Sequence, residues 1–186
     1  MRIIGIDPGT SVTGIGILEK RNEKIFFIHY DCINLNSKDS LPGRLKKIYD
    51  ECLLCIEKFK PDEFAIETAF YGKNIQSTLK LGQARGVAII AALNSNLKIS
   101  EYSPREVKKS VTGNGASSKE QVQYMVKSIL SLREKIMSVD SSDALAVALC
   151  HFFFLQNGFS KVQTMRKNNS WKFFAEQNPG RIISKK

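Results

Sequence analysis

The sequence predicts an α/β fold in which helices flank a five-stranded mixed sheet. Short runs rich in Ile, Val and aromatic residues end in turn residues, as strands do, and longer segments repeat apolar residues at helical spacing. Three strand-like runs come first with no helix between them, and two more each follow a helical segment. Strands joined by turns pair antiparallel and strands reached through a helix lie parallel, so one sheet should contain both directions.

Length and composition limit the class of protein. A chain of 186 residues suits one well-packed domain, and 42% apolar with 25% charged residues excludes disorder throughout. The longest uncharged apolar run, residues 86–93, is too short to span a bilayer, and no basic, then apolar, leader is present, so we expect a cytoplasmic protein. The pair Cys52 and Cys55 has no second pair to complete a zinc site, so the four cysteines should be buried, reduced thiols.

The net charge of +10 is unevenly distributed along the chain. Residues 1–72 hold 10 basic and 11 acidic residues, whereas residues 73–135 hold 11 and 4, and residues 160–186 hold 7 and 1. A basic half beside a nearly neutral half suggests a polyanionic partner bound on one face. Surface charge without any partner gives the same count.

The first strand, residues 3–7, ends in Asp7. Pro8 and Gly9 then turn the chain into a second strand around residues 15–18, and residues 24–34 form a third. A carboxylate leaving a buried strand either opens the turn or meets a cation such as a metal ion. Only further carboxylates at the same place would favour the metal.

A second carboxylate ends the fourth strand. Residues 41–59 have helical spacing and end before Pro61, and residues 63–67 follow as a strand that should lie parallel to the first. Glu67 ends this strand as Asp7 ends the first. Ligands bind outside the carboxyl ends of parallel strands, so both acids should face one crevice.

The middle of the chain alternates helices and loops. Residues 73–94 form a helix whose small residues allow close packing on the sheet or on another subunit, and residues 98–102 form the fifth strand. Pro104 starts a short helix, and a capping box beginning at Ser118 starts another that runs to about Leu132. The glycine loop before Ser118 either binds a phosphate or only connects the two helices.

The last helix starts near Ser138 and carries Asp140 and Asp143 on one face of its first turn. Acids there are also ordinary helix-start residues, stabilised by the helix dipole. His151 lies roughly 16 Å further along the helix, too far to share a metal with Asp140. His29, within a strand, should be packed or solvated.

These residues together resemble the RuvC family of crossover junction endodeoxyribonucleases, the bacterial Holliday junction resolvases. The resemblance covers about residues 1–155. It rests on the stretches 5–9, 65–67, 80–88, 107–108, 119–123 and 140–146, in that order. It implies a ribonuclease-H-like fold, and a homodimer that nicks two strands of like polarity in a four-way DNA junction, leaving 5′-phosphate and 3′-hydroxyl ends.

The resemblance also assigns roles to individual residues. It implies that Asp7, Glu67, Asp140 and Asp143 hold two Mg²⁺ ions, or Mn²⁺ in their place, with Asp7 bridging both. Oxygen ligands suit such hard cations, and two ions about 4 Å apart can activate water and stabilise the leaving oxygen. Lys119, as a catalytic and DNA-binding residue, and Lys108 are expected near the scissile strand, and Phe70 is expected to stack on an unpaired base.

The chain should divide into a nuclease domain, residues 1–157, and a basic C-terminal tail, residues 158–186. The tail interleaves basic and aromatic residues, which suits nucleic acid or loose packing, and it has no assigned role. By resemblance, the protein should work with the RuvA and RuvB branch-migration proteins.

Three other functions are alternatives to junction cleavage. Actin-like and sugar kinases share the Gly-Ile-Asp start, but they need a duplicated fold for which this chain is too short. A ribonuclease-H-like nuclease acting on RNA is a closer alternative. The third is a module that binds junctions without cutting them, and it has no reason to gather four acids beside DNA.

Overall fold

The computed structural model describes residues 1–22, 24–68, 74–132 and 139–168, and no side chain beyond residue 156. Two compact units divide the chain, residues 1–153 and residues 154–186. The first unit contains the whole sheet. The boundary expected between residues 157 and 158 stays a prediction.

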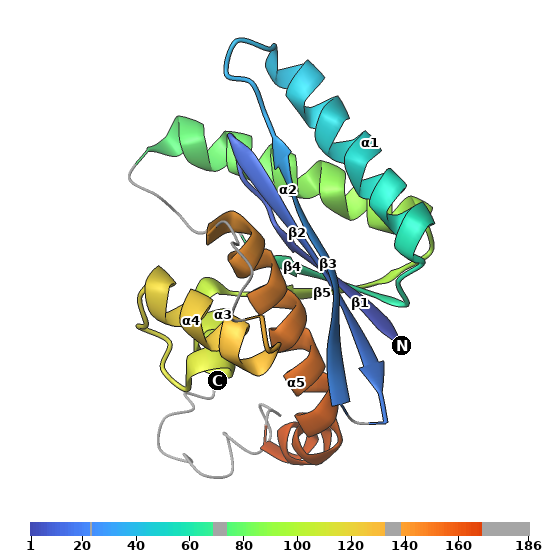
Figure 1. The fold of residues 1–186 in the computed structure, drawn as a ribbon, viewed down its shortest axis with the longest axis vertical. Helices are drawn as coiled ribbons and strands as arrows, with labels where there is room; N and C mark the ends of the chain where they lie inside the picture. The colour runs from blue at the N-terminus through green and yellow to red at the C-terminus, as the bar shows by residue number, and fades with distance from the viewer. Residues whose placement is uncertain (23, 69–73, 133–138, 169–186) are drawn as a thin grey trace, which may run out of the picture. The chain divides into compact units, whose positions relative to one another are not determined.

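Five strands form one mixed sheet in the order β3-β2-β1-β4-β5, as expected (Figure 1). Neighbours β1, β2 and β3 pair antiparallel, whereas β4 lies parallel to β1, and β5 parallel to β4. The strand bounds are β1 Arg2–Asp7, β2 Val12–Arg21, β3 Lys24–Asn34, β4 Glu63–Glu67 and β5 Lys98–Tyr102. The predicted crossover therefore places Glu67 on the strand beside Asp7.

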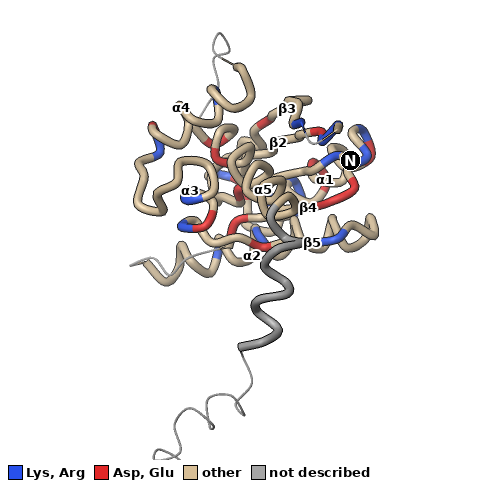
Figure 2. Tube along the Cα trace, turned by 90° about the horizontal axis from the view of Figure 1, so that it is seen from below, with Lys and Arg blue, Asp and Glu red and all other residues tan. Residues whose placement is uncertain are grey.

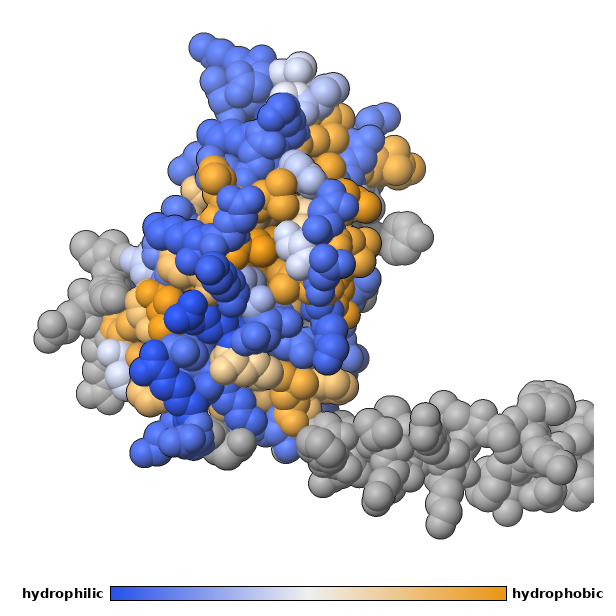
Figure 3. All heavy atoms as spheres, turned by 90° about the vertical axis from the view of Figure 1, so that its right-hand side faces the viewer, coloured by the Kyte–Doolittle hydropathy of each residue, from blue (hydrophilic) through white to orange (hydrophobic). Residues whose placement is uncertain are grey.

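Helices cover both faces of this sheet (Figure 1). The helices α1 and α2 lie on one face, and α3, α4 and the first part of α5 lie on the other. Their bounds are α1 Leu41–Phe59, α2 Ile75–Asn94, α3 Pro104–Thr112, α4 Lys119–Ile129 and α5 Val139–Asn168. The side shown in Figure 3 mixes hydrophilic residues with small apolar patches. No helix among the described residues is long and apolar enough to cross a membrane.

Large apolar side chains fill the space between the sheet and the helices α1 and α2. Ile4 and Ile6 on β1, Ile15 on β2 and Phe64 on β4 are at most 1% exposed, and they pack against apolar residues of both helices. Alternate residues of a strand face opposite sides, so the residues between them face α5.

Glycines on this second face let α5 approach the sheet directly. A Cβ added at Gly5 would lie 2.4 Å from the carbonyl oxygen of Ala144, and one at Gly14 would lie 2.2 Å from that of Asp140. Such distances are far below van der Waals contact. The helix therefore rests on strand backbone, and this contact fixes the height of its first turn above the sheet.

The helix boundaries follow local chemistry. Ser118 forms the predicted capping box with Gln121, and Ser103 forms another at the start of α3. The prediction that the fourth helix runs to Leu132 was wrong, because α4 ends at Ile129 and Ser131 adopts a left-handed backbone with φ of 55°. The expected starts at residues 73 and 138 lie outside the described residues.

The four cysteines are free thiols, as predicted, although their burial differs. Cys52 and Cys150 are buried, whereas Cys32 and Cys55 are only half-buried, so the expectation of burial was correct for two of the four.

Candidate active site

Asp7 and Glu67 end the two central strands at the same edge of the sheet. Ile6 of β1 pairs with Ile66 of β4, so the acid that follows each of them leaves the sheet at the same level. Gly5 faces α5, and Asp7, two residues later on the same strand, faces the same side. Both carboxylates therefore point toward the start of α5.

The first turn of α5 brings two further acids to this edge. The carbonyl oxygen of Asp140 lies against Gly14, and Gly14 pairs with Asp7 across the antiparallel strands. Asp143, three residues on, lies on the same helix face, and its side chain is 14% exposed. Acids separated by more than a hundred residues thus meet because a glycine admits the helix.

Burial and mutual repulsion perturb these carboxyl groups strongly. Loss of solvent, then the charge of Asp143, raises the pKa of Asp7 to about 7. Loss of solvent, then the charge of Asp7, raises the pKa of Glu67 to about 8, and burial also raises the pKa of Asp143. Asp143 and Asp140 both raise the pKa of Asp7, and Asp7 raises that of Glu67, so the other three predicted acids lie within electrostatic range of Asp7.

Two lysines from the neighbouring helices face these acids. Lys119 Nζ donates to Asp143 Oδ2 at 2.9 Å, and this bond raises the pKa of the lysine. Lys108 of α3 lies close enough to lower the pKa of Glu67 and Asp143, although other groups outweigh it. Figure 2 shows basic segments of α3 beside acidic segments near α5. The structure therefore brings both predicted lysines to the acids.

The donor chemistry of this site fits a hard divalent cation, although the ligands are not preassembled. Among the described residues, no three His, Cys, Asp or Glu side chains form a group spaced to hold a metal ion. Carboxylate oxygens are the ligands that Mg²⁺ prefers, and a bound cation would oppose the burial and like-charge repulsion that raise the pKa of Asp7 and of Glu67. Asp7, Glu67, Asp140 and Asp143 would hold such an ion, which would compete with Lys119 for Asp143.

Phe70 and the two histidines are the other residues that the sequence singled out. Phe70 falls outside the described residues, so its expected stacking role stays a prediction. His151 is buried away from the acids, with Nδ1 2.7 Å from the hydroxyl of Tyr102, and His29 stacks on Phe59 at 4.8 Å between ring centroids. His29 therefore packs, which is one of the two roles expected for it, and His151 is a buried core residue.

Sequence reasoning missed the glycines of β2 that face α5. Gly14 and Gly16 alternate at the strand period, so they occupy one face, and a Cβ at Gly16 would meet Leu145 at 2.8 Å. That alternation was the available signal. Because the partner helix lies more than a hundred residues later in the chain, no local pattern identifies it.

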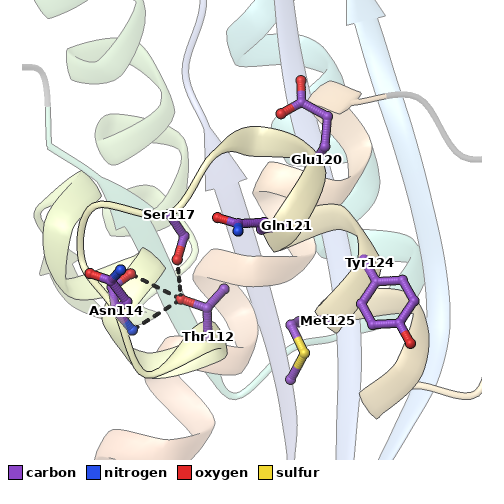
Figure 4. Close-up of a pocket in the computed structure, with 7 residues that line it drawn as sticks. All are labelled: Thr112, Asn114, Ser117, Glu120, Gln121, Tyr124 and Met125. Atoms are coloured by element: carbon purple, nitrogen blue, oxygen red, sulfur yellow. Dashed lines mark hydrogen bonds between the residues drawn. The ribbon is translucent and has the colours of Figure 1, made fainter.

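The glycine loop between α3 and α4 is closed by its own side chains (Figure 4). The hydroxyl of Thr112 lies 2.8 Å from that of Ser117 and accepts from the backbone N–H of Asn114 at 3.1 Å. The loop and the first turns of α4 line an open cavity of about 490 Å³, whose far side carries the exposed ring of Tyr124. These bonds already occupy the hydroxyls of Thr112 and Ser117. The phosphate site that the sequence allowed in this loop stays a prediction.

Comparison with known proteins identifies a family. The family model described as "Crossover junction endodeoxyribonuclease RuvC" matches residues 3–151. A protein of that name from Chloroherpeton thalassium is 49% identical over 98% of this chain and 100% of its own length. One from Salinibacter ruber is 44% identical over 98% of this chain and 99% of its own.

Solved structures agree with this match. The Thermus thermophilus RuvC structure in complex with a Holliday junction substrate is 31% identical, with a TM-score of 0.79 over 85% of this chain and 96% of that one. The expected ribonuclease-H-like fold, a five-stranded mixed sheet flanked by helices, is confirmed.

Proposed function

The chain belongs to the RuvC family of crossover junction endodeoxyribonucleases, and we propose that it resolves four-way DNA junctions in recombination and repair. Each subunit hydrolyses one phosphodiester, and the two cuts fall on strands of like polarity. The single observation that carries the proposal is the gathering of Asp7, Glu67, Asp140 and Asp143 beside Lys119. A module that only binds junctions has no use for four acids facing a polyanion.

The residues divide the chemistry among themselves. Divalent ions, Mg²⁺ or Mn²⁺, would activate the attacking water and stabilise the leaving oxygen when bound as a pair. Asp7, which lies between Glu67 and Asp140, would be a ligand of both ions. Lys119 and Lys108 contact the scissile strand and stabilise charge developing on its phosphate. The products carry 5′-phosphate and 3′-hydroxyl ends, and no protein nucleophile takes part.

A homodimer matches the two equivalent cuts, and α2 supplies the surface for it. Four large apolar side chains are exposed along one side of this helix, separated by three or four residues or by sums of three and four: Ile75, Leu79, Ile90 and Leu93. Gly82 and Gly86 continue the same stripe, with nothing within 4 Å of an added Cβ. An exposed apolar helix stripe with small residues at its centre suits a second copy of this helix.

One substitution pair tests the dimer. Leu79→Glu places a charge in the stripe and should yield monomers in sedimentation velocity, with loss of paired cutting. Leu54→Glu on α1 is the matched control, because Leu54 and Leu79 are equally exposed at 58%. Dimers that survive Leu79→Glu would contradict this interface.

The same proposal covers the compartment, the partner proteins and the role of Phe70. Junctions reach the enzyme in the cytoplasm from the RuvA and RuvB branch-migration proteins. Phe70 stacks on a base unpaired at the junction centre, where such stacking contributes roughly 1 to 3 kcal/mol.

Cleavage of a synthetic four-way junction in Mg²⁺ tests the proposed activity. Asp7→Asn should bind the junction as tightly as the unmodified protein and cut it at least 1,000-fold more slowly, on the order expected when a charge-stabilising group is lost. Asp50→Asn on α1 removes an exposed acid that pairs with Lys46 and should cut normally. Normal cutting by Asp7→Asn would contradict the metal site. Equal cutting of linear duplex, or preferential cutting of an RNA–DNA hybrid, would refute the junction specificity.

A further inference from the structure

A second cationic site lies beside the loop that follows Asp7. Residues 9–10 of this loop line a small groove of about 10 Å³ together with Arg44 and Leu45 of α1 and Lys80 of α2, and its other lining residues are mostly apolar. The groove therefore lies where the start of α1 and the second turn of α2 meet the loop that leaves the acidic edge of the sheet.

Neither cation of this groove has an acidic partner among the described residues. Arg44 Nη1 donates to the carbonyl oxygen of Thr10 at 3.1 Å, which uses one of the five guanidinium donors. Its Nε is buried without a hydrogen-bond partner among the described residues. Within the described part of the chain, neither Arg44 nor Lys80 forms an ion pair, whereas Lys46, two residues along α1, pairs with Asp50.

Hydrogen bonds within the chain hold this loop. The backbone N–H of Gly9 donates to the hydroxyl of Thr13 at 3.3 Å, and that hydroxyl lies 3.2 Å from the carbonyl oxygen of Gly9. Thr13 is fully buried, and Arg44 braces Thr10 from the other side. Arg44 is thus tied to this loop through Thr10, whereas Lys80 reaches the same groove from the exposed side of α2.

The distance to the acids suits a continuous DNA strand. Thr10 follows Asp7 by three residues, so their Cα atoms are at most about 11 Å apart. Phosphates on one strand recur about every 3.4 Å along the duplex axis, so Thr10, at the edge of the groove, lies within about three nucleotides of Asp7. We propose that Arg44 and Lys80 bind backbone phosphates of the cleaved strand and thereby fix its path across the acids. This inference rests on the proposed function and adds residues to which no role has been assigned.

The salt dependence of junction binding tests this proposal, because each neutralised phosphate releases condensed counterions. Fluorescence anisotropy with a labelled four-way junction in EDTA, over a range of NaCl concentrations, gives the slope of log K against log salt. Lys80→Ala should weaken binding and make the slope shallower by about one, since one phosphate contact is lost. Lys46→Ala is the matched control and should leave both affinity and slope unchanged.

Arg44 needs one further comparison, because it also braces the loop. Arg44→Ala should make the slope shallower by about one, and Arg44→Lys, which keeps the charge, should retain the original slope. Weakened binding by Arg44→Ala at an unchanged slope would show a bracing role alone and overturn the phosphate assignment, as would an unchanged slope for Lys80→Ala. If the unmodified protein does not prefer junction over duplex, the proposed function fails instead.

Discussion

The two faces of the sheet use the same strands for different purposes. Toward α1 and α2 the strands present Ile4, Ile6 and Phe64, which are fully buried and pack against large side chains. Toward α5 they present Gly5 and Gly14 and then the acids. One face supplies apolar burial, and the other gives up side-chain volume to bring a helix backbone close. Along each strand, the residues that face α1 and α2 therefore provide stability, and the residues between them set the position of the site.

The largest expected effect on stability is on the apolar face. Phe64→Ala should lower the free energy of unfolding by about 3–5 kcal/mol, because a fully buried ring leaves a cavity. Urea denaturation measures the loss. Cleavage per folded molecule should remain near normal at low temperature, and a specific loss of cutting would show that the two faces are not separable.

Substitutions on the face that packs against α5 should instead affect cutting more than stability. Gly14→Ala should cost about 1–3 kcal/mol of stability, because its Cβ would lie 2.2 Å from the carbonyl oxygen of Asp140 and must displace α5. Cutting should fall far more than stability does. Ile15→Val, on the next residue, faces the other side and should cost about 0.5–1.5 kcal/mol with cutting retained. Equal cutting by both variants would contradict the role of close approach.

The acidic edge should make stability depend on pH when no divalent ion is present. The pKa of Asp7 rises from 3.8 to about 7 on folding and that of Glu67 from 4.5 to about 8. Between about pH 4 and 8 the folded protein therefore binds more protons than the unfolded chain, and its free energy of unfolding falls as pH rises. In EDTA at pH 8, Asp7→Asn should thus be more stable than the unmodified protein by about 1–3 kcal/mol.

At pH 3 this difference should nearly disappear, since that pH lies below both the ordinary pKa of 3.8 and the raised pKa of Asp7, which is then largely protonated in both states. Thermal unfolding at the two pH values measures it. A variant that is less stable at pH 8 than the unmodified protein would mean that the carboxylate is already compensated within the protein.

The smallest expected effect on stability comes from Lys119. Its side chain is 60% exposed, so Lys119→Ala should change the free energy of unfolding by less than about 1 kcal/mol despite the bond to Asp143. Junction cutting in Mg²⁺ should nevertheless fall by about 100-fold or more, because the positive charge near the phosphate is lost. Lys46→Ala removes a comparable surface ion pair and should leave the cutting rate unchanged.

The sequence predicted the strands better than the contacts between them and α5. The bounds of β3, β4 and β5 follow from local composition, and the caps at Ser103 and Ser118 follow from hydrogen-bonding chemistry. The end of α4 was missed because the left-handed backbone at Ser131 has no marker such as glycine.

The sequence identified the residues of the site better than it predicted how they are arranged in space. Asp7 and Glu67 could be placed together from strand order alone, whereas Asp140 reaches them only because Gly14 admits the helix. The bond from Lys119 to Asp143 and the unpaired donors of Arg44 depend on long-range packing, so sequence spacing says nothing of them.

Calorimetry of Mg²⁺ binding at pH 7, in two buffers of different ionisation enthalpy, tests most directly whether the four acids form one cation site. The unmodified protein should release about one proton as Mg²⁺ binds, because at that pH Glu67 is mostly protonated and Asp7 about half protonated, and both must lose the proton to ligate the ion. The Asp7→Asn variant should bind more weakly and release fewer protons. Identical affinity and proton release in the two proteins would contradict the site.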